Sequence, residues 1–144
     1  ETLKREKKEF LFSKFDLILS PAMGGIIIVY EIGKLLEVET IFTERVNGEF
    51  ELRRDFSINA NDKVLVVEDV ITTGKSSLEC SKIVKKNNAI TVGYACIIDR
   101  SNGKSSVQGK IVSQISLNIP TYTEDNLPST LSSIKAVKPG SRNL

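Results

Sequence analysis

The residues best suited to chemistry are gathered in one stretch, VLVVEDVITTGKSS, over residues 64–77. An apolar run that predicts a buried strand leads to two adjacent carboxylates, Glu68 and Asp69, and residues 72–76 then combine two threonines, a glycine, a lysine and a serine. Hydroxyls, a glycine able to take positive φ, and backbone N–H groups at a helix start can together bind an anion such as phosphate. Carboxylates instead accept hydrogen bonds from vicinal hydroxyls or help to hold hydrated Mg²⁺. A ligand that satisfies both halves carries a phosphate and a nearby diol, as a ribose 5-phosphate does.

Two other interpretations of this stretch compete with a sugar-phosphate site. Gly74-Lys75-Ser76 resembles the end of a nucleoside triphosphatase P-loop, but that motif requires a glycine five positions before Gly74, where Asp69 stands. Two carboxylates in such a loop would also repel a triphosphate. Alternatively, the hydroxyl residues only cap a helix and the acids are solvated. A cap needs one hydroxyl rather than this ordered set, so the sequence favours a ligand site.

Two further segments place suitable groups after predicted strands. Residues 20–25, SPAMGG, lie between a strand and a helix, so their backbone N–H groups can face an anion; the alternative is a glycine-eased turn. Arg100 ends another apolar run. Its guanidinium can bind a planar acceptor edge with paired donors, or it forms a surface ion pair with Asp99.

A long polar connection over residues 45–62 carries three arginines, Arg45, Arg53 and Arg54. The dipeptide Asn47-Gly48 within it predicts a hairpin. For Arg53 and Arg54, a purely solvated hairpin is as good an interpretation as a ligand site.

The elements that must position these residues follow a regular order. The predicted helices cover residues 24–38 and residues 74–88, and residues 1–14 suggest the end of an N-terminal helix. The predicted buried strands are residues 15–20, 40–44, 63–69 and 90–99, with an edge strand in residues 110–119 and a polar C-terminal tail in residues 120–144.

This order predicts an α/β fold in a single domain over residues 1–144, with an open, mainly parallel twisted sheet and flanking helices. Ligands of such sheets bind beyond the carboxyl ends of the strands. The loops after Leu19, Glu44, Val67 and Ile98 are therefore the expected place for function.

Composition excludes several function classes. The 144 residues include no histidine, which removes Ser-His-Asp and Cys-His nucleophiles in their usual form and imidazole zinc sites. The net charge of +2 gives no general case for nucleic acid, and the apolar run from Ile26 to Tyr30 is far too short to cross a membrane. Cys80 and Cys96 lie in apolar segments, which predicts buried, reduced thiols in a cytoplasmic protein.

The string VEDVITTGKSS resembles the phosphoribosyl pyrophosphate (PRPP) motif of the type I phosphoribosyltransferases. In addition, SPAMGGIII is similar to the pyrophosphate loop of that family, FTERVNGEFELRRDF to its mobile catalytic loop, and IIDRSNG to its base-side strand end. With the closing KPGSR, these segments resemble bacterial orotate phosphoribosyltransferases over nearly the whole chain. The resemblance implies an enzyme of UMP biosynthesis that transfers the 5-phosphoribosyl group of PRPP to orotate, giving orotidine 5′-phosphate and pyrophosphate.

The resemblance also implies a role for individual residues. Glu68 and Asp69 would bind the ribose hydroxyls and, with Arg45, contribute to catalysis. Thr72 and Arg100 would contact orotate. The pyrophosphate loop, which in the family often contains a non-proline cis peptide, would comprise Ala22, Met23, Gly24 and Gly25. The residues implied to bind PRPP are Arg45, Glu68, Asp69, Val70, Ile71, Thr72, Thr73, Gly74, Lys75 and Ser76.

The partners implied by the resemblance are small molecules and a second copy of the chain. Mg²⁺ would be held mainly through PRPP, with Asp69 as the candidate protein ligand. In a homodimer, the loop near Arg45 would reach the neighbouring site. Family members carry an N-terminal hood over the base, and the printed sequence begins after it. Some members carry lysine at the position of Gly24, and enteric-type relatives carry lysines and a histidine in the mobile loop.

Two alternatives remain at the level of sequence. The phosphate site does not distinguish one base from another, so the acceptor could be another nucleobase. The chain could also be a regulator that senses PRPP without catalysis, although its near-neutral charge and the absence of a helix-turn-helix pattern disfavour this.

Overall fold

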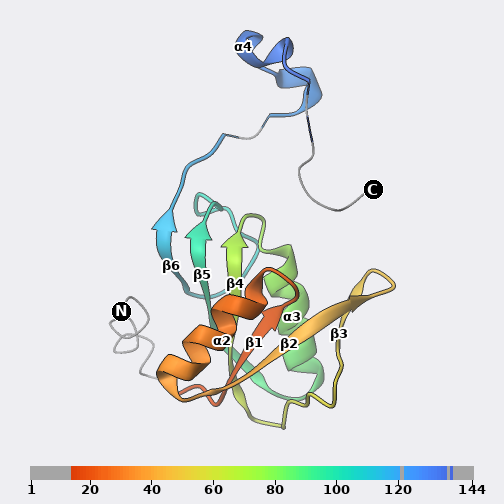
Figure 1. Ribbon diagram of the computed structural model, residues 1–144, viewed down its shortest axis with the longest axis vertical. Coiled ribbons are helices and arrows are strands. Elements are labelled where there is room, and N and C mark those ends of the chain that lie inside the picture. The colour runs from red at the N-terminus through yellow and green to blue at the C-terminus, as the bar shows by residue number, and fades with distance from the viewer. Residues whose placement is uncertain (1–13, 121, 136, 138–144) are drawn as a thin grey trace.

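Figure 1 shows the computed structural model, in which residues 14–120, 122–135 and 137 are described. The strands are β1 (Leu17–Pro21), β2 (Glu39–Val46), β3 (Glu49–Leu52), β4 (Lys63–Ile71), β5 (Ile90–Asp99) and β6 (Ile111–Ser116). The helices are α2 (Gly25–Leu36), α3 (Lys75–Lys86), the one-turn α4 (Ser129–Ser132) and the 3₁₀ turn η1 (Glu124–Asn126). The predicted N-terminal helix and the KPGSR segment lie outside the described residues.

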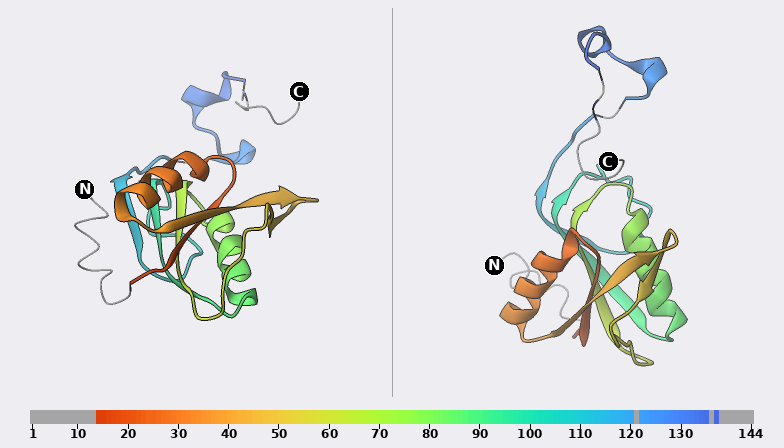
Figure 2. Two further views of the ribbon diagram at one scale, coloured as in Figure 1. Left: turned by 60° about the horizontal axis from the view of Figure 1, so that its bottom comes forward. Right: turned by 45° about the vertical axis from the view of Figure 1, so that its right-hand side comes forward.

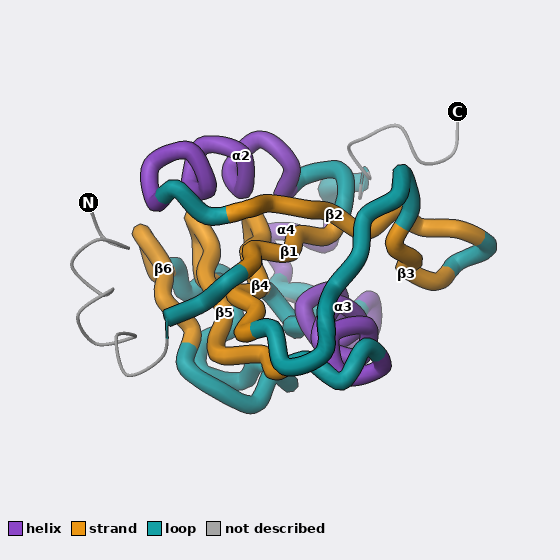
Figure 3. Tube along the Cα trace, turned by 90° about the horizontal axis from the view of Figure 1, so that it is seen from below, coloured by secondary structure: helices purple, strands orange, loops and turns teal. Residues whose placement is uncertain are grey.

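The strands form one six-stranded sheet in the order β3-β2-β1-β4-β5-β6. Within it, β2 and β3 pair in antiparallel fashion, and the other neighbours pair in parallel. Figure 3 shows α2 on one face of the sheet and α3 on the other. The predicted open, mainly parallel sheet with flanking helices is therefore confirmed.

The central strand β4 explains why both faces need a helix. The side chains of Val64, Leu65, Val66 and Val67 are fully buried. Because strand side chains alternate, Val64 and Val66 join the core cluster under α3, whereas Leu65 and Val67 join the cluster under α2. This uninterrupted apolar run is the pattern that predicted the strand.

Three predicted strand ends fall short of those in the structure. Strand β1 continues to Pro21, one residue beyond the predicted end. Strand β2 continues through Arg45 to Val46, because Arg45 pairs with Phe50 across the hairpin. Strand β4 continues to Ile71, two residues beyond the predicted end, so the acidic pair lies within the strand rather than at its end. The polar pair Glu68-Asp69 interrupts the apolar pattern before Val70 and Ile71, and the pattern therefore understated the strand length.

The hairpin itself was predicted from Asn47-Gly48, and it is confirmed. Both residues take positive φ, 50° and 91°, as the tight turn between β2 and β3 requires. The hairpin projects from the sheet beside α3 (Figures 1 and 2). Among the described residues, no helix is long and apolar enough to span a lipid bilayer.

Candidate active site

One cavity of about 590 Å³ lies beside the carboxyl ends of β1 and β4. Three of the four predicted segments, residues 20–25, 45–62 and 64–77, contribute to its lining. An adjoining hollow of about 130 Å³ lies against the 72–76 segment and shares Glu68, Lys75 and Ser76 with the larger cavity. The larger cavity is lined by Pro21, Ala22, Met23, Gly24, Arg45, Phe50, Glu68, Asp69, Lys75 and Ser76. The smaller one is lined by Glu68, Val70, Thr72, Thr73, Gly74, Lys75 and Ser76.

The two adjacent carboxylates lie on opposite faces of the sheet and contact different elements there. Glu68 meets the first turn of α3, where the hydroxyl of Ser77 donates a hydrogen bond of 2.5 Å to Glu68 Oε2. Asp69 meets the loop before α2, where it lies against Gly24. Strand alternation therefore lets one dipeptide line the cavity from two directions.

Burial raises the pKa of Glu68 above its usual value, and hydrogen bonds from Ser77 and Ser76 oppose that rise. Ser77 is itself fully buried, so its hydroxyl supports the carboxylate from the protein side. Sequence reasoning stopped at Ser76 and missed this residue. Its signal was a second serine in the first turn of the predicted helix.

The raised pKa predicts a pH-dependent cost to stability. The folded protein binds the Glu68 proton more tightly than the unfolded chain does. The free energy of unfolding is therefore lowered progressively as the pH rises from the ordinary value of 4.5 through the raised one. In Glu68→Gln the charge is gone, and the amide oxygen can still accept from Ser77. Urea unfolding should show the variant more stable than the wild type at neutral pH, with the gap closing below pH 4.5. A gap that widens on acidification would contradict this account.

The SPAMGG loop is packed tightly against the acids. The peptide bond between Ala22 and Met23 is cis, as the resemblance led us to expect. A Cβ at Gly24 would lie 2.7 Å from Asp69 Cγ, and one at Gly25 would lie 3.2 Å from the backbone oxygen of Val67. Neither position therefore has room for a side chain.

The 72–76 segment forms the predicted turn into α3. Gly74 takes a φ of 79°, the left-handed conformation that favours glycine. The Lys75 N–H is 3.3 Å from the Thr73 hydroxyl, and the first-turn N–H groups of α3 have no intrahelical carbonyl to bind. This local geometry suits an oxyanion.

A second loop supports the turn from behind, and sequence reasoning missed it. The Ser106 N–H donates to the Thr73 carbonyl at 2.9 Å. A Cβ at Gly74 would collide with Ser105 and Val107. No local sequence signal indicates this support, because Ser106 is 33 residues from Thr73 in the chain.

Arg45 reaches the larger cavity from the end of β2. Its Nη2 lies 2.6 Å from Glu79 Oε2, its Nη1 donates to the Gly48 carbonyl, and its Cζ lies 3.9 Å from the Phe50 ring centroid. Arg54 is instead engaged away from the cavity, where it forms a two-point ion pair with Glu44.

Arg100 lies beside the 72–76 segment at the end of β5. The backbone N–H of Arg100 donates a hydrogen bond to the Ile71 carbonyl at 2.8 Å. Asp99 accepts from the Ser101 N–H, and within the described residues it forms no ion pair with Arg100, so the ion-pair alternative is wrong. The Arg100 Nε is buried and has no hydrogen-bond partner in the described part of the chain. A buried donor left unpaired in this way calls for an explanation, and a bound ligand is one such explanation.

The two cysteines take no part in the site. Both are buried and free, as predicted. Burial raises the pKa of Cys80 to about 12 and that of Cys96 to about 11, so neither thiol ionises readily.

This combination of fold and site defines a class. Residues 3–125 match the profile of the phosphoribosyl transferase domain, and the chain belongs to the type I phosphoribosyltransferase family. Curated orotate phosphoribosyltransferases are similar to it over nearly its whole length. That of Maricaulis maris is 44% identical over 128 residues, which cover 89% of this chain and 66% of the relative. That of Parvibaculum lavamentivorans is 43% identical over 144 residues, which cover 100% of this chain and 72% of the relative.

These matches confirm the resemblance to orotate phosphoribosyltransferases that the motifs indicated. The chain spans about two thirds of the length of the curated relatives it matches. Among solved structures, the orotate phosphoribosyltransferase of Aeropyrum pernix matches with a TM-score of 0.63 at 17% identity, covering 81% of this chain and 67% of that one. The adenine phosphoribosyltransferase of Thermoanaerobacter pseudethanolicus matches with a TM-score of 0.66 at 20% identity, covering 81% and 78%. These two likenesses support the fold alone.

Proposed function

We propose that this chain carries the catalytic core of an orotate phosphoribosyltransferase, which joins orotate to the ribose of PRPP and releases pyrophosphate. The observation that carries the proposal is the larger cavity, where the acidic pair, the SPAMGG loop, Arg45 and the start of α3 face one space. Sequence similarity to curated orotate phosphoribosyltransferases supports the choice of acceptor.

In this proposal each wall of the cavity meets a different part of PRPP. The hydroxyls and N–H groups of residues 72–76 hold the 5-phosphate. Glu68 and Asp69 accept hydrogen bonds from the ribose hydroxyls. When the bond from ribose C1 to pyrophosphate breaks, positive charge builds on the sugar ring, and the two carboxylates stabilise it. The departing pyrophosphate is received by the N–H groups of residues 22–25 and by Arg45.

Magnesium fits this site as an ion held mainly by the substrate. The described residues contain no group of three or more acidic, cysteine or histidine side chains that could enclose a metal. Two carboxylates do line the cavity, and Mg²⁺ commonly binds through one or two carboxylates plus substrate phosphates. Asp69 is the proposed protein ligand, and the ion would neutralise charge on the pyrophosphate.

The orotate site is proposed to lie where β4 and β5 end. Thr72 follows Ile71, whose carbonyl binds the Arg100 N–H, so the two candidate residues are neighbours. The Arg100 guanidinium, whose Nε has no hydrogen-bond partner among the described residues, would donate to the carboxylate or a ring carbonyl of orotate.

Replacing Arg100 with alanine should therefore raise the KM for orotate about tenfold or more, while the KM for PRPP changes little, because a charge-assisted hydrogen bond contributes about 1.5–3 kcal/mol. Steady-state kinetics with each substrate varied in turn would measure this. Equal changes in both constants would assign Arg100 a structural role instead.

A homodimer is part of the proposal. Met23, which lines the cavity just before α2, and Ile27 and Tyr30 on α2 are 82%, 79% and 59% exposed. An exposed apolar stripe of this kind suits a protein contact. Sedimentation over a range of concentrations would test whether that contact is a second copy.

The function is tested by the choice of acceptor. The full-length protein that contains this chain should turn over PRPP with orotate in the presence of Mg²⁺. Parallel reactions with uracil, adenine, guanine and xanthine should be far slower. Turnover with a purine alone would refute the proposal.

A further inference from the structure

Arg45 is held from three sides by groups that sequence reasoning did not connect with it. Glu79 comes from the second turn of α3, Phe50 from β3, and the Gly48 carbonyl from the hairpin turn. The guanidinium has five N–H donors, and these contacts occupy only part of them. Donors therefore remain for oxygens in the cavity that Arg45 lines.

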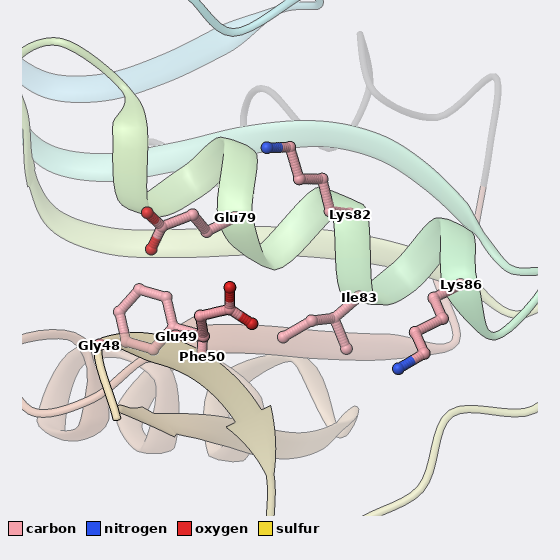
Figure 4. Close-up of a pocket in the computed structure, with 7 residues that line it drawn as sticks. All are labelled: Gly48, Glu49, Phe50, Glu79, Lys82, Ile83 and Lys86. Atoms are coloured by element: carbon pink, nitrogen blue, oxygen red, sulfur yellow. The ribbon is translucent and has the colours of Figure 1, made fainter. Parts of the chain in front are cut away.

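The two residues of the ion pair, Arg45 and Glu79, line different cavities. Arg45 lines the larger cavity together with the acidic pair. Glu79 instead lines a groove of about 300 Å³ between the hairpin and α3, which Figure 4 shows with Glu79 and Phe50 facing each other across it. Phe50 lines both spaces. The carboxylate therefore holds the guanidinium from the side away from the cavity.

Because that groove is open, the hairpin is not packed against α3 along its whole length. Lys82, Ile83 and Lys86 line the α3 side of the groove below Glu79. Figure 4 shows the Ile83 side chain, which also packs against the core cluster, at the groove between Glu79 and Lys86. The ion pair of Arg45 with Glu79 joins the hairpin to the helix at the cavity end.

We infer that Glu79 is a positioning residue: it holds the Arg45 guanidinium, stacked on Phe50, at the mouth of the cavity where the pyrophosphate of PRPP binds. This inference rests on the proposed function and deepens it. A long arginine side chain free in water loses conformational entropy when it binds an anion, and a partner that fixes it beforehand removes part of that cost. Precise placement matters most where charge develops during the reaction.

The structure offers a matched control on the same hairpin. Glu44 pairs with Arg54 through two hydrogen bonds of 2.9 and 3.1 Å, and neither residue lines the cavity. Glu44→Gln and Glu79→Gln therefore remove the same charge from the same kind of pair. Only the second pair includes an arginine that faces the cavity.

The test is a double-mutant cycle in the full-length protein, with kcat/KM for PRPP as the readout. We expect Glu79→Gln to lower it about fivefold, which matches the roughly 1 kcal/mol that such a pair contributes, while Glu44→Gln leaves it unchanged. In an Arg45→Ala background, Glu79→Gln should cause no further loss, because its effect passes through Arg45. The KM for orotate should not change with Glu79→Gln.

The possible results distinguish a failure of the positioning role of Glu79 from a failure of the proposed function. If Arg45→Ala lowers kcat/KM but Glu79→Gln does not, the positioning role is wrong and the function stands. If Glu79→Gln costs as much with alanine at position 45 as with arginine, Glu79 acts on the fold and not through Arg45. If Arg45→Ala itself has no effect, the proposed role of Arg45 fails. If the wild type does not turn over orotate, the proposed function fails.

Discussion

Asp69→Asn should lower kcat with PRPP and orotate by about 10²- to 10³-fold, the range seen when one group that stabilises developing charge is removed. The asparagine is nearly the same size, and its carbonyl oxygen can still accept the Val70 N–H, which donates to Asp69 Oδ1 at 2.9 Å in the structure. The lost property is therefore the negative charge beside the ribose. Steady-state kinetics would measure the effect, and thermal unfolding should show an unchanged midpoint.

Asp55→Asn is the control for this change. Asp55 is exposed on the loop after the hairpin, and its φ of 60° is one that asparagine adopts readily. The same charge is removed at a distance from the cavity, so turnover should stay at the wild-type level. Asp69→Asn with wild-type kcat, or with a loss matched by Asp55→Asn, would remove Asp69 from the catalytic site.

Gly24→Ala is expected to have the second large effect. The position has helical φ and ψ of −55° and −38°, so alanine strains no backbone there, and Gly24 is exposed. The new methyl group would nevertheless lie 2.7 Å from Asp69 Cγ and push the carboxylate aside. A displacement of about 1 Å at a reacting centre can cost about 10²-fold in rate, and we expect a loss of that order in kcat with little change in the unfolding temperature.

The combination of these variants shows whether the loss passes through Asp69. In an Asp69→Asn background, Gly24→Ala should add little, because the group that it displaces has already lost its charge. A full, additive loss in the double variant would mean that Gly24 acts on the pyrophosphate loop independently.

The order of elements was predictable because each carries its own local signal. The apolar run of residues 64–67 is long enough to fill both faces of a sheet, and Asn47-Gly48 has the conformational freedom that a tight hairpin needs. Strand ends were less predictable. Arg45 belongs to β2 through pairing with Phe50 across the Asn47-Gly48 turn, and the turn signal alone did not show how far along the strands this pairing extends.

The PRPP motif and the other family segments could be identified without the structure. Recognition of a phosphate and a diol requires particular residue types next to one another in the chain. The sequence therefore determined that an acidic pair precedes a hydroxyl-rich turn and a helix. It could not show that Glu68 and Asp69 contact different elements, one Ser77 on α3 and the other Gly24 before α2.

Most of the contacts that only the tertiary structure decided join residues far apart in the chain. Glu79 is 34 residues from Arg45, and Ser106 meets Thr73 across the end of the sheet. Local spacing determines which side chains share a face of a strand or helix. It does not determine which of these faces pack together when the helices cover the sheet. For this reason the reactive groups were found from the sequence, whereas the groups that hold them in place were found only in the fold.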